Sequence, residues 1–531
     1  MMKKVLVLTL AALLTAAMAL GCAKQPVAAE PGGAPPAPAV EPGAEPAAPA
    51  EGEKVFRYAR SWEEASWDPA LFGQADDVEL AMVIFETLLE IDKEGKIHPA
   101  LAESYEESGD HLTYTFHLRK GVQFHGGYGE LKANDVKFTW ERHKDPAVGS
   151  KNVANLNLEN ISAIETPDDY TVVFKLAKPD VDFLTRCALY YSYILCEAHY
   201  KDVGLEGMVL HPIGTGPFMY DSGTPMTHTE AVRFDGYWGE KAKIDRITNT
   251  IIADATTGYT AMENGELEAI AVYDIDKAEE FAAKGFNVVD IPYMELLYVS
   301  SNPQNPPFDN PKVREAMFAA IDPQYFIDQM FHGTTVIPGS YVPAASKYAV
   351  TDYFKPTYDP ERAKALLAEA GYPDGVTVTL WAPNDALSTT PAIIVQSQLA
   401  EAGFNVELQL VDFGVFADKV RNGETQLWLL YNTTPVLADE TISRYTSDHY
   451  PGSNWSGIVD AEYDKLVAAG FAATTEAEKA DYFAQAQKRL MDLQVLYPIS
   501  THNFSYVTKP GVDNYYINFD GLVHLDNVTI D

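Results

Sequence analysis

The chain after residue 110 first shows a regular alternation of apolar and polar positions. Within residues 112–124, apolar side chains occupy every second position from Leu112 to Leu118, and residues 170–176 repeat the same period. Alternation with a period of two is typical of half-buried β-strands. Between these segments, Val136 and Trp140 have the spacing of one helix face, which predicts a short helix with Asn134 as its N-cap.

From residue 310 onward the pattern changes to helices that alternate with strands. Helices are predicted where Asn or Asp is followed by Pro, a pair that suits an N-cap and a first helical turn, at residues 310–321, 322–333 and 359–371. The order strand, helix, strand, helix, strand is predicted next, at residues 376–381, 391–403, 404–412, 413–423 and 425–432. Such alternation implies right-handed crossovers and a mostly parallel sheet covered by helices.

A similar helix and strand at residues 254–274 indicate that the first half of the chain has a sheet of its own. The length of 531 residues also exceeds the roughly 250–300 residues that one hydrophobic core supports. The sequence therefore predicts an α/β protein of two lobes. Ligands favour the cleft between two such lobes and the C-terminal ends of parallel strands, so the functional site is expected there.

The N-terminus has the pattern of an export signal. Two lysines precede an apolar run from Val5 to Leu20, which is shorter than the roughly 20 residues of a membrane-spanning helix. The run is followed by Gly21 and Cys22, which resemble the lipobox of bacterial lipoproteins. We expect residues 1–21 to be a signal peptide and Cys22 to be acylated. The alternative is a secreted protein that is cleaved nearby and in which Cys22 is incidental.

Residues 22–53 form a segment rich in Pro, Ala and Glu that contains no aromatic residue and holds eight of the chain's 33 prolines. Such a composition cannot bury a core and favours extended conformations at about 3.1 Å per residue, so roughly 30 residues reach up to about 90 Å. We interpret this segment as a tether that joins a membrane anchor to a folded body.

Charge and motif content exclude several classes of function. The chain has 39 Lys and Arg against 76 Asp and Glu, a formal net charge of −37, so no nucleic-acid partner is expected. Four histidines, expected on turns and solvent-facing strand positions, lack the convergent spacing of metal ligands: His98, His111, His117 and His125. We expect no metal and no cofactor. The absence of GxSxG, HExxH and Walker patterns disfavours an enzyme.

Two further cysteines leave their redox state open. Cys187 and Cys196 are close enough in sequence to form a disulfide in an exported protein, and they are equally consistent with buried thiols. His199 follows Cys196 closely, but a catalytic thiol also needs a base that meets it in space and a third group that orients the base. The sequence indicates no such group near Cys196 and His199, so catalysis by this pair is not expected.

Eight segments in collinear order resemble the extracellular solute-binding proteins of family 5, the oligopeptide-, dipeptide- and nickel-binding proteins of ABC importers. They are the stretch "HPALAESYEESGDHLTYTFHLRKGVQFHGG" at 98–127 and the shorter segments 66–70, 84–92, 211–220, 233–247, 261–270, 305–322 and 509–518. The resemblance implies a bilobal periplasmic-binding-protein-like clamp, type II, in the large form of family 5. It implies a discontinuous lobe I at 54–95, 180–299 and 502–531, a subdomain of lobe I inserted at 96–179, and a contiguous lobe II at 300–501.

The resemblance also implies how the protein works. The lobes would close around a small solute by a hinge motion, with hinges at residues 298–302 and 498–503, and deliver the solute to an ABC permease in the cytoplasmic membrane. We expect a monomeric lipoprotein of the cell envelope, held at the membrane by Cys22, that binds its ligand without catalysis.

The segment 427–440 is the most informative about the ligand. In peptide-binding relatives the matching strand end carries an aromatic residue and, three positions later, an Asp that pairs with the α-ammonium of the peptide. Here Tyr431 matches the aromatic residue and Thr434 stands at the position of the Asp. A hydroxyl cannot provide the charge-assisted bond that a buried ammonium requires. Recognition of a free peptide N-terminus would then depend on another acid, Asp439 or Glu440.

Other candidate ligand-binding residues lie where strands are predicted to end: Trp381, Asn384, Tyr273, Asp274, Tyr298, Asn454 and Trp455. Their side chains suit stacking on a solute and hydrogen bonding to it, although core and surface aromatic residues give the same pattern. We rank peptides or modified peptides first as the ligand, then oligosaccharides or metal chelates. A secreted hydrolase on the same scaffold is the alternative from another class.

Overall fold

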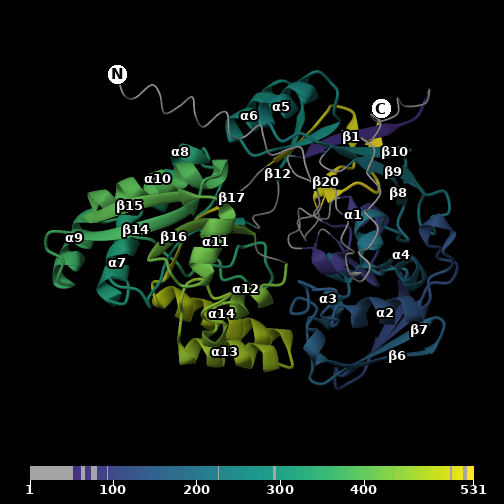
Figure 1. The fold of residues 1–531 in the computed structure, drawn as a ribbon, viewed down its shortest axis with the longest axis horizontal. Helices are drawn as coiled ribbons and strands as arrows, with labels where there is room; N and C mark the ends of the chain where they lie inside the picture. Colours follow the sequence, from purple (N-terminus) through teal and green to yellow (C-terminus); the bar gives the residue numbers. More distant parts are fainter. Residues whose placement is uncertain are drawn as a thin grey trace, which may run out of the picture. The chain divides into compact units, whose positions relative to one another are not determined.

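The computed structural model describes residues 52–60, 66–72, 80–92, 94–224, 227–290, 295–433, 436–502, 505–517 and 523–531, which all belong to one compact unit, Pro46–Asp531. Cys22, most of the tether and Thr434 lie outside the described residues. Within the described ranges, three larger sheets and their covering helices form two lobes (Figure 1). The same ranges contain no helix that is both long and apolar enough to cross a membrane.

The first lobe is organised by a mixed seven-stranded sheet. Its order is β12 (Asn287–Asp290), β18 (Ser505–Thr508), β11 (Ala269–Val272), β1 (Val55–Arg60), β10 (Arg246–Ile251), β9 (His228–Arg233) and β8 (Phe218–Thr224). β1 pairs in parallel with β10 and β11. Strands from both ends of the chain share this sheet, so the first lobe is discontinuous in sequence. The predicted helix and strand at 254–274 are confirmed as α5 (Ala255–Glu263) and β11, and α6 (Ile275–Ala283) packs on β12 and β18.

An antiparallel four-stranded sheet forms a second part of the first lobe. Its order is β4 (Ala102–Glu107), β5 (Thr113–Leu118), β7 (Thr171–Leu176) and β6 (Ile161–Asp168). Alternate residues of β5 and β7 are buried, as their period of two predicted. Trp140 of α2 (Ala133–Arg142) packs edge-on against Phe174, with ring centroids 5.0 Å apart. The predicted cap of α2 was wrong. The helix begins after Lys132, because the Asp135 carboxylate accepts the Lys132 backbone N–H at 2.9 Å.

Shorter elements complete the described part of the first lobe: α1 (Ala81–Ile84), α3 (Phe183–Arg186), α4 (Glu197–Leu210), β2 (Leu89–Ile91) paired with β3 (Ile97–Pro99), β19 (Val512–Asp513) with β22 (Thr529–Ile530), and β20 (Tyr516–Ile517) with β21 (Val523–His524). Cys187 and Cys196 are free, buried thiols. His125 lies in a short turn, as expected, but its side chain does not face solvent. Its ring is fully buried against Phe234 and bonds the carbonyl of Gly216 at 2.9 Å, and burial lowers its pKa to about 4.

The second lobe is built on a five-stranded sheet with the order β15 (Phe404–Val411), β14 (Val376–Pro383), β16 (Leu427–Thr433), β13 (Glu295–Ser301) and β17 (Leu496–His502). The predicted parallel unit is confirmed, since β14 pairs in parallel with both β15 and β16. The chain steps from β14 out to β15 and back to β16, so right-handed crossovers place α10 (Ala386–Glu401) and α11 (Phe413–Arg421) on opposite faces. Both helices contact β14.

The remaining helices of the second lobe are α7 (Pro311–Ala320), α8 (Pro323–Met330), α9 (Pro360–Glu369), α12 (Asp439–Ser443), α13 (Ala461–Ala472) and α14 (Glu476–Asp492). The first three begin at the predicted caps, because the carboxylates of Asp322 and Asp359 and the amide of Asn310 accept backbone N–H groups of their first turns. α10 begins earlier than predicted. The Asp385 carboxylate accepts the Ser388 N–H at 2.7 Å, and Pro391 lies within the helix.

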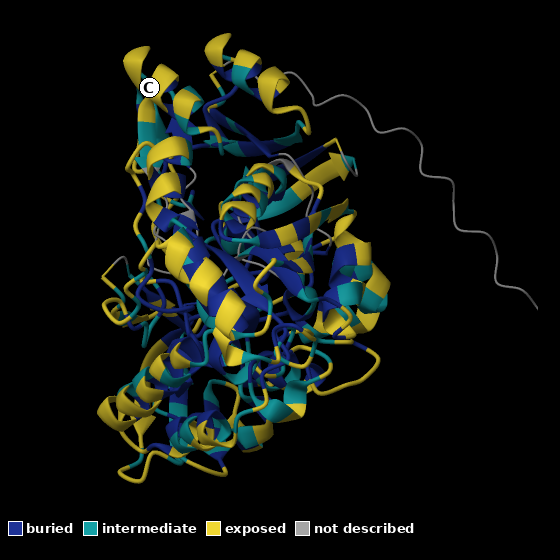
Figure 2. Cartoon of the chain, turned by 90° about the vertical axis from the view of Figure 1, so that its left-hand side faces the viewer, coloured by how far each residue is buried: buried dark blue, intermediate teal, exposed yellow. Residues whose placement is uncertain are grey.

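In both lobes the helices turn buried residues inward and exposed residues outward (Figure 2), and the strands inside the sheets, such as β1 and β13, are mostly buried. Residues 298–301 of the first predicted hinge lie in β13 and residues 498–502 of the second lie in β17, so both predicted hinges overlap strands of the second lobe. Tyr298 lies in the middle of β13, a strand that pairs with β16 and β17 of the second lobe. The chain passes between lobes before Glu295, where β13 begins, and again between His502 and Ser505.

A partly buried carboxylate in the first lobe makes folding stability depend on pH. The hydroxyl of Tyr237 and the indole N–H of Trp238 donate hydrogen bonds to Glu86 at 3.0 and 2.9 Å. Desolvation raises the pKa of Glu86 to about 7, against the opposing effect of these bonds. The folded protein thus holds this proton more tightly than the unfolded chain. The resulting stabilisation is complete below about pH 4.5 and is lost as the pH rises through 7.

Glu86→Gln is therefore expected to flatten the pH dependence of stability. When the pH rises from 5 to 8, deprotonation of Glu86 should lower the unfolding free energy of the wild type by on the order of 2 kcal/mol. The neutral amide of Glu86→Gln does not titrate, so the variant should not show this loss. Urea unfolding at both pH values measures the difference, with the exposed Glu103→Gln as control. An unchanged pH slope in Glu86→Gln would contradict this assignment.

Candidate functional site

The carboxyl ends of the parallel strands of both sheets lie at the two places where the chain passes between lobes. In the first lobe, β11 ends at Val272 opposite Ser505, and Ser505 also pairs with Asp290 at the end of β12. In the second lobe, the end of β16 pairs with Glu295 at the start of β13, and Glu295 also pairs with His502. We call these two sets of strand ends the carboxyl edges.

The connections between the lobes are short, so the two carboxyl edges lie close together. Three Cα–Cα steps separate His502 from Ser505, so their Cα atoms are at most about 11 Å apart. Five steps separate Asp290 from Glu295, at most about 19 Å. The edges of the two sheets therefore lie near each other at these connections, and the carboxyl ends of parallel strands are where open α/β sheets bind ligands.

On the second lobe, this edge carries several of the side chains that the sequence singled out. Tyr431 pairs with Leu297 close to the end of β16, and its side chain is half-buried. Asn384 is exposed just beyond β14, held by a hydrogen bond from its backbone N–H to the carbonyl of Val411 at 2.9 Å. Burial, together with the charges of Glu295 and Asp385, raises the pKa of Tyr431. Aromatic, amide and carboxylate groups thus meet at one edge.

On the first lobe, the same edge carries Arg60 at the end of β1 and Tyr273 just beyond β11. Both line a small cavity together with Tyr506 of β18. Asp274 was predicted as a ligand-binding residue and serves as the N-cap of α6, with its carboxylate accepting the Lys277 N–H at 3.3 Å. Sequence reasoning missed Arg60, although a charge at the end of an otherwise apolar strand was a usable signal.

Other predicted residues lie in the core of the second lobe. Tyr298 is 4% exposed and packs against Trp428, with ring centroids 5.2 Å apart. Trp455 contacts the same Trp428 ring at 6.0 Å, and Trp381 is half-buried beside this core. Asn454 is buried and bonds backbone carbonyls of its own loop. The structure does not bring these side chains to the carboxyl edge, except that Trp381 lies two residues before the end of β14.

Asp439, one candidate for binding a peptide ammonium, is held by cations of the protein. It is 4% exposed and accepts hydrogen bonds from Arg186 of the first lobe and, at 2.9 Å, from Lys479 of the second. Arg186 in turn bonds Asp180 at 2.9 Å. The other candidate, Glu440, accepts two bonds from Arg444 at 2.7 and 2.8 Å. Each carboxylate thus already has a cationic partner.

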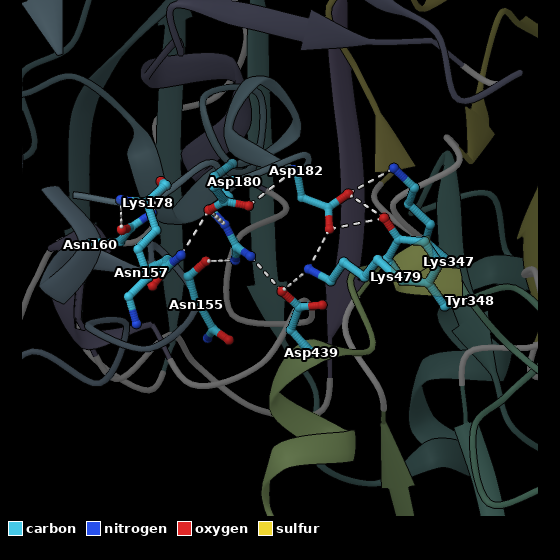
Figure 3. A network of polar contacts seen from close by, with 11 residues as sticks. Asn155, Asn157, Asn160, Lys178, Asp180, Asp182, Lys347, Tyr348, Asp439 and Lys479 are labelled. Carbon is cyan, nitrogen blue, oxygen red and sulfur yellow. Dashed lines mark hydrogen bonds and ion pairs between the residues drawn. The ribbon is translucent and has the colours of Figure 1, made fainter. Parts of the chain in front are cut away.

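Asp182 is the centre of the same set of contacts between the lobes. It belongs to the first lobe, is fully buried and accepts bonds from three side chains of the second lobe: Lys479 at 2.7 Å, Lys347 at 2.7 Å and Tyr348 at 2.8 Å. Figure 3 shows these side chains converging across the interface. We define the interlobe network as the following residues: Asp180, Asp182, Arg186, Lys347, Tyr348, Asp439 and Lys479.

The interlobe network is balanced in charge, with three carboxylates facing one guanidinium and two ammonium groups. Burial alone would raise the pKa of Asp182, but Lys479 and Lys347 lower it to about 2. A lowered pKa means that this stabilisation is present above about pH 3.8 and is lost as the pH falls through 2. The contacts of Asp182 should therefore persist from pH 5 to 8.

Apolar contacts accompany these charges. Val436 and Leu437, which precede α12, are 3% and 4% exposed and belong to the hydrophobic core of the first lobe. Lys347 fixes this segment, because its backbone N–H donates to the carbonyl of Val436 at 2.7 Å. The structure therefore represents the lobes in contact.

A second contact between the lobes involves His332, which follows α8. Its two ring nitrogens lie 3.5 Å from Asp276 and 3.4 Å from Glu279, both on α6 of the first lobe. Among the described residues, these three have ligand atoms within 4.8 Å of one another, close enough for a metal ion. All three side chains are exposed, and the contacts of His332 with the two carboxylates account for the arrangement.

A cavity of about 640 Å³ lies within the second lobe alone, between α7, α9 and the end of α14. Phe318, Phe354, Asp359, Arg362 and Asp492 are among its lining residues. None of the lining residues belongs to a carboxyl edge, so this cavity is separate from the candidate site.

Comparisons with known proteins agree with this architecture. Residues 96–454 match the family model described as "Bacterial extracellular solute-binding proteins, family 5 Middle". The chain is 29% identical over 510 residues to the dipeptide-binding protein of Escherichia coli K12, covering 90% of this chain and 95% of that protein. It is 28% identical over 518 residues to heme-binding protein A of Haemophilus influenzae, covering 89% and 93%. The structure of the periplasmic binding protein DppA from Helicobacter pylori, in complex with the peptide STSA, matches with a TM-score of 0.77 at 25% identity, over 90% of this chain and 98% of that chain.

Proposed function

Since the chain belongs to the bacterial extracellular solute-binding proteins of family 5, the solute-binding components of ABC importers, we propose that it captures peptides or modified peptides and delivers them to a permease. One observation carries this proposal most directly. The carboxyl edges of the two sheets lie where the chain connects the lobes, and each edge carries hydrogen-bonding and aromatic side chains. The dipeptide- and peptide-binding relatives support peptides as the first ligand class.

The proposed ligand contacts come from both lobes. Tyr431, Asn384 and Trp381 would contact the solute from the second lobe, and Tyr273 from the first. Ligand contacts with both lobes favour the closed arrangement, since a ligand stabilises whichever conformation it binds more tightly. The interlobe network then contributes to closure without contacting the ligand. The protein acts as a monomer and releases its ligand chemically unchanged.

A panel of dipeptides, tripeptides, glutathione, oligosaccharides and heme tests this function. Members of the proposed ligand class should raise the melting temperature of the full chain in proportion to their affinity. Chromatography after prolonged incubation should recover the same compound. Stabilisation by heme or an oligosaccharide, and by no peptide, would contradict peptide binding. Conversion of a peptide or ester by the protein would favour the hydrolase alternative.

We also propose that the mature protein is a lipoprotein anchored through Cys22, on the basis of the apolar run and the Gly21–Cys22 pair alone. Cells expressing the full chain with labelled palmitate should yield a labelled protein, and Cys22→Ala should abolish the label, because its only attachment thiol is gone. Cys187→Ala serves as the control, since that thiol is buried and should not affect labelling. Label retained by Cys22→Ala would contradict the anchor.

A further inference from the structure

The cavity of about 640 Å³ in the second lobe has the size of a small-molecule site, since such sites occupy roughly 300–1,000 Å³. Its walls are α7, the start of α9, the end of α14, one residue of β17 and the segment 353–357, which forms no helix or strand. All of these walls belong to the second lobe. A ligand in this cavity would contact one lobe only, so its binding would not require the lobes to close.

Aromatic and aliphatic side chains form the floor of the cavity. The rings of Phe318, Phe354 and Tyr497 pack edge-on against one another, with centroids 6.0, 4.9 and 5.2 Å apart. Leu366 adds a buried aliphatic side chain to this floor. The Tyr497 hydroxyl donates to the carbonyl of Ile321 at 2.8 Å, so its polar atom already has a partner within the protein. Phe354 is only half-buried, which leaves part of its ring open to an apolar ligand.

The carboxylates around the cavity already have partners. Glu315 accepts a bond from the Arg362 side chain at 3.3 Å. Asp359 caps α9 by accepting the backbone N–H of Arg362 at 2.8 Å. Asp492 accepts the hydroxyl of Tyr353 at 2.6 Å. A cationic ligand would have to compete with these contacts for each carboxylate.

Lys355 differs from the other charged residues of the cavity. It follows Phe354, whose backbone N–H donates to the carbonyl of Gly339 at 2.8 Å and holds the chain at this point. In the part of the chain that the structure describes, no hydrogen bond or ion pair reaches the Lys355 ammonium. The ammonium has three N–H donors, all of which can bind an anionic group. An unpaired cation beside an apolar floor suits a ligand with an anionic end and an apolar body.

We propose that this cavity is a second ligand site, which binds a small aromatic carboxylate with its ring on the floor beside Phe354 and its carboxylate at Lys355. This activity goes beyond the proposed capture of a solute between the lobes and does not depend on it. Lys355 is exposed, and exposed ion pairs contribute only about 0–1 kcal/mol. The ring therefore supplies most of the affinity, and the charge selects the acid over neutral or cationic analogues.

Saturation-transfer NMR titrations of the full chain with phenylacetate and with phenylacetamide test this site. The two probes share the ring and differ in charge. For the wild type we expect a Kd for phenylacetate on the order of 1 mM, as suits a ligand of this size, and about threefold weaker binding of the amide. Lys355→Met should remove this preference by weakening the acid alone. Phe354→Ala should weaken both probes about fivefold or more, because it removes the exposed ring of the floor.

Lys364→Met is the matched control, because Lys364 pairs with Glu361 at 2.6 Å on the surface of α9 and does not line the cavity. It should leave the affinities for both probes unchanged. The dipeptide Met-Leu, a probe for the site between the lobes, should not displace phenylacetate. Melting curves establish that each variant is folded.

Several results would overturn the second site. Phenylacetate might show no saturable binding, or the cation phenethylamine might bind more tightly than the acid. Wild-type affinity for phenylacetate in folded Phe354→Ala would place the probe elsewhere, and displacement by Met-Leu would place it between the lobes. An unchanged preference for the acid in folded Lys355→Met would show that Lys355 does not bind the carboxylate.

Discussion

Asp182→Asn is expected to weaken the affinity for Met-Leu by at least tenfold while leaving the cores of both lobes intact. Asp182 is fully buried and receives bonds from Lys347, Tyr348 and Lys479, all of the opposite lobe. Removing one partner of a buried ion pair costs about 3–5 kcal/mol because it leaves an uncompensated charge. That cost arises only when the lobes are in contact, since the same side chains meet water when the lobes separate. The closed population falls, and the apparent affinity falls by the same fraction.

The size of this effect follows from the same arithmetic. A loss of about 1.4 kcal/mol of binding free energy already weakens the affinity tenfold. The effect would be smaller than tenfold only if structural relaxation or water entry removed most of the penalty for the unpaired charge. Calorimetry gives the affinity, and small-angle scattering gives the fraction of closed molecules. A double-mutant cycle with Lys479→Met isolates the pair. Wild-type affinity and closure in Asp182→Asn would show that the interlobe network does not contribute to closure.

Arg142→Met should have the opposite signature, a large loss of stability without loss of affinity. Arg142 of α2 makes two bonds to Asp68, at 2.8 and 2.5 Å, and both side chains are almost completely buried within the first lobe. Leaving Asp68 buried and unpaired should lower the free energy of unfolding by about 3–5 kcal/mol. Urea unfolding measures the loss.

Lys364→Met is the control for Arg142→Met, because Lys364 pairs with Glu361 on the surface of α9 and such pairs contribute about 0–1 kcal/mol. The affinity of folded Arg142→Met for Met-Leu should stay within a factor of about two of the wild type, since both lobes still meet through the interlobe network. If Arg142→Met unfolded at the same urea concentration as the wild type, or lost affinity without losing stability, the Arg142–Asp68 pair would not act on stability alone.

Local chemistry made much of the fold predictable. The helices that begin after Asn310, Asp322 and Asp359 start as predicted because a side-chain acceptor and a following Pro act within one turn. The parallel unit of the second lobe followed from its periodicity. The errors were local as well. The sequence pattern favours Asn134 as the cap of α2, but Asp135 accepts the backbone N–H of Lys132 one turn back. It favours a helix start at Pro391, but the helix begins earlier because Asp385 caps it.

The interlobe network was not predictable in the same way, because its members are far apart in sequence. Asp182 and Lys479 are separated by 297 positions, and no local pattern pairs them. One signal was present. Lys479 lies on the same face of α14 as Phe483, Ala486 and Leu490, all buried, and a lysine on an apolar helix face needs a buried counter-charge. The identity of that counter-charge required the structure, as did the engagement of Asp439, which the sequence alone offered as a ligand contact.

Native mass spectrometry of the full chain, titrated with the peptide panel, tests whether the protein reversibly captures an unmodified peptide between its lobes. We expect a single adduct of one peptide per protein, which is released intact when the protein is unfolded and restored when the same peptide is added back. Spectra that show only the bare chain throughout the panel, or a peptide mass altered by the protein, would contradict it.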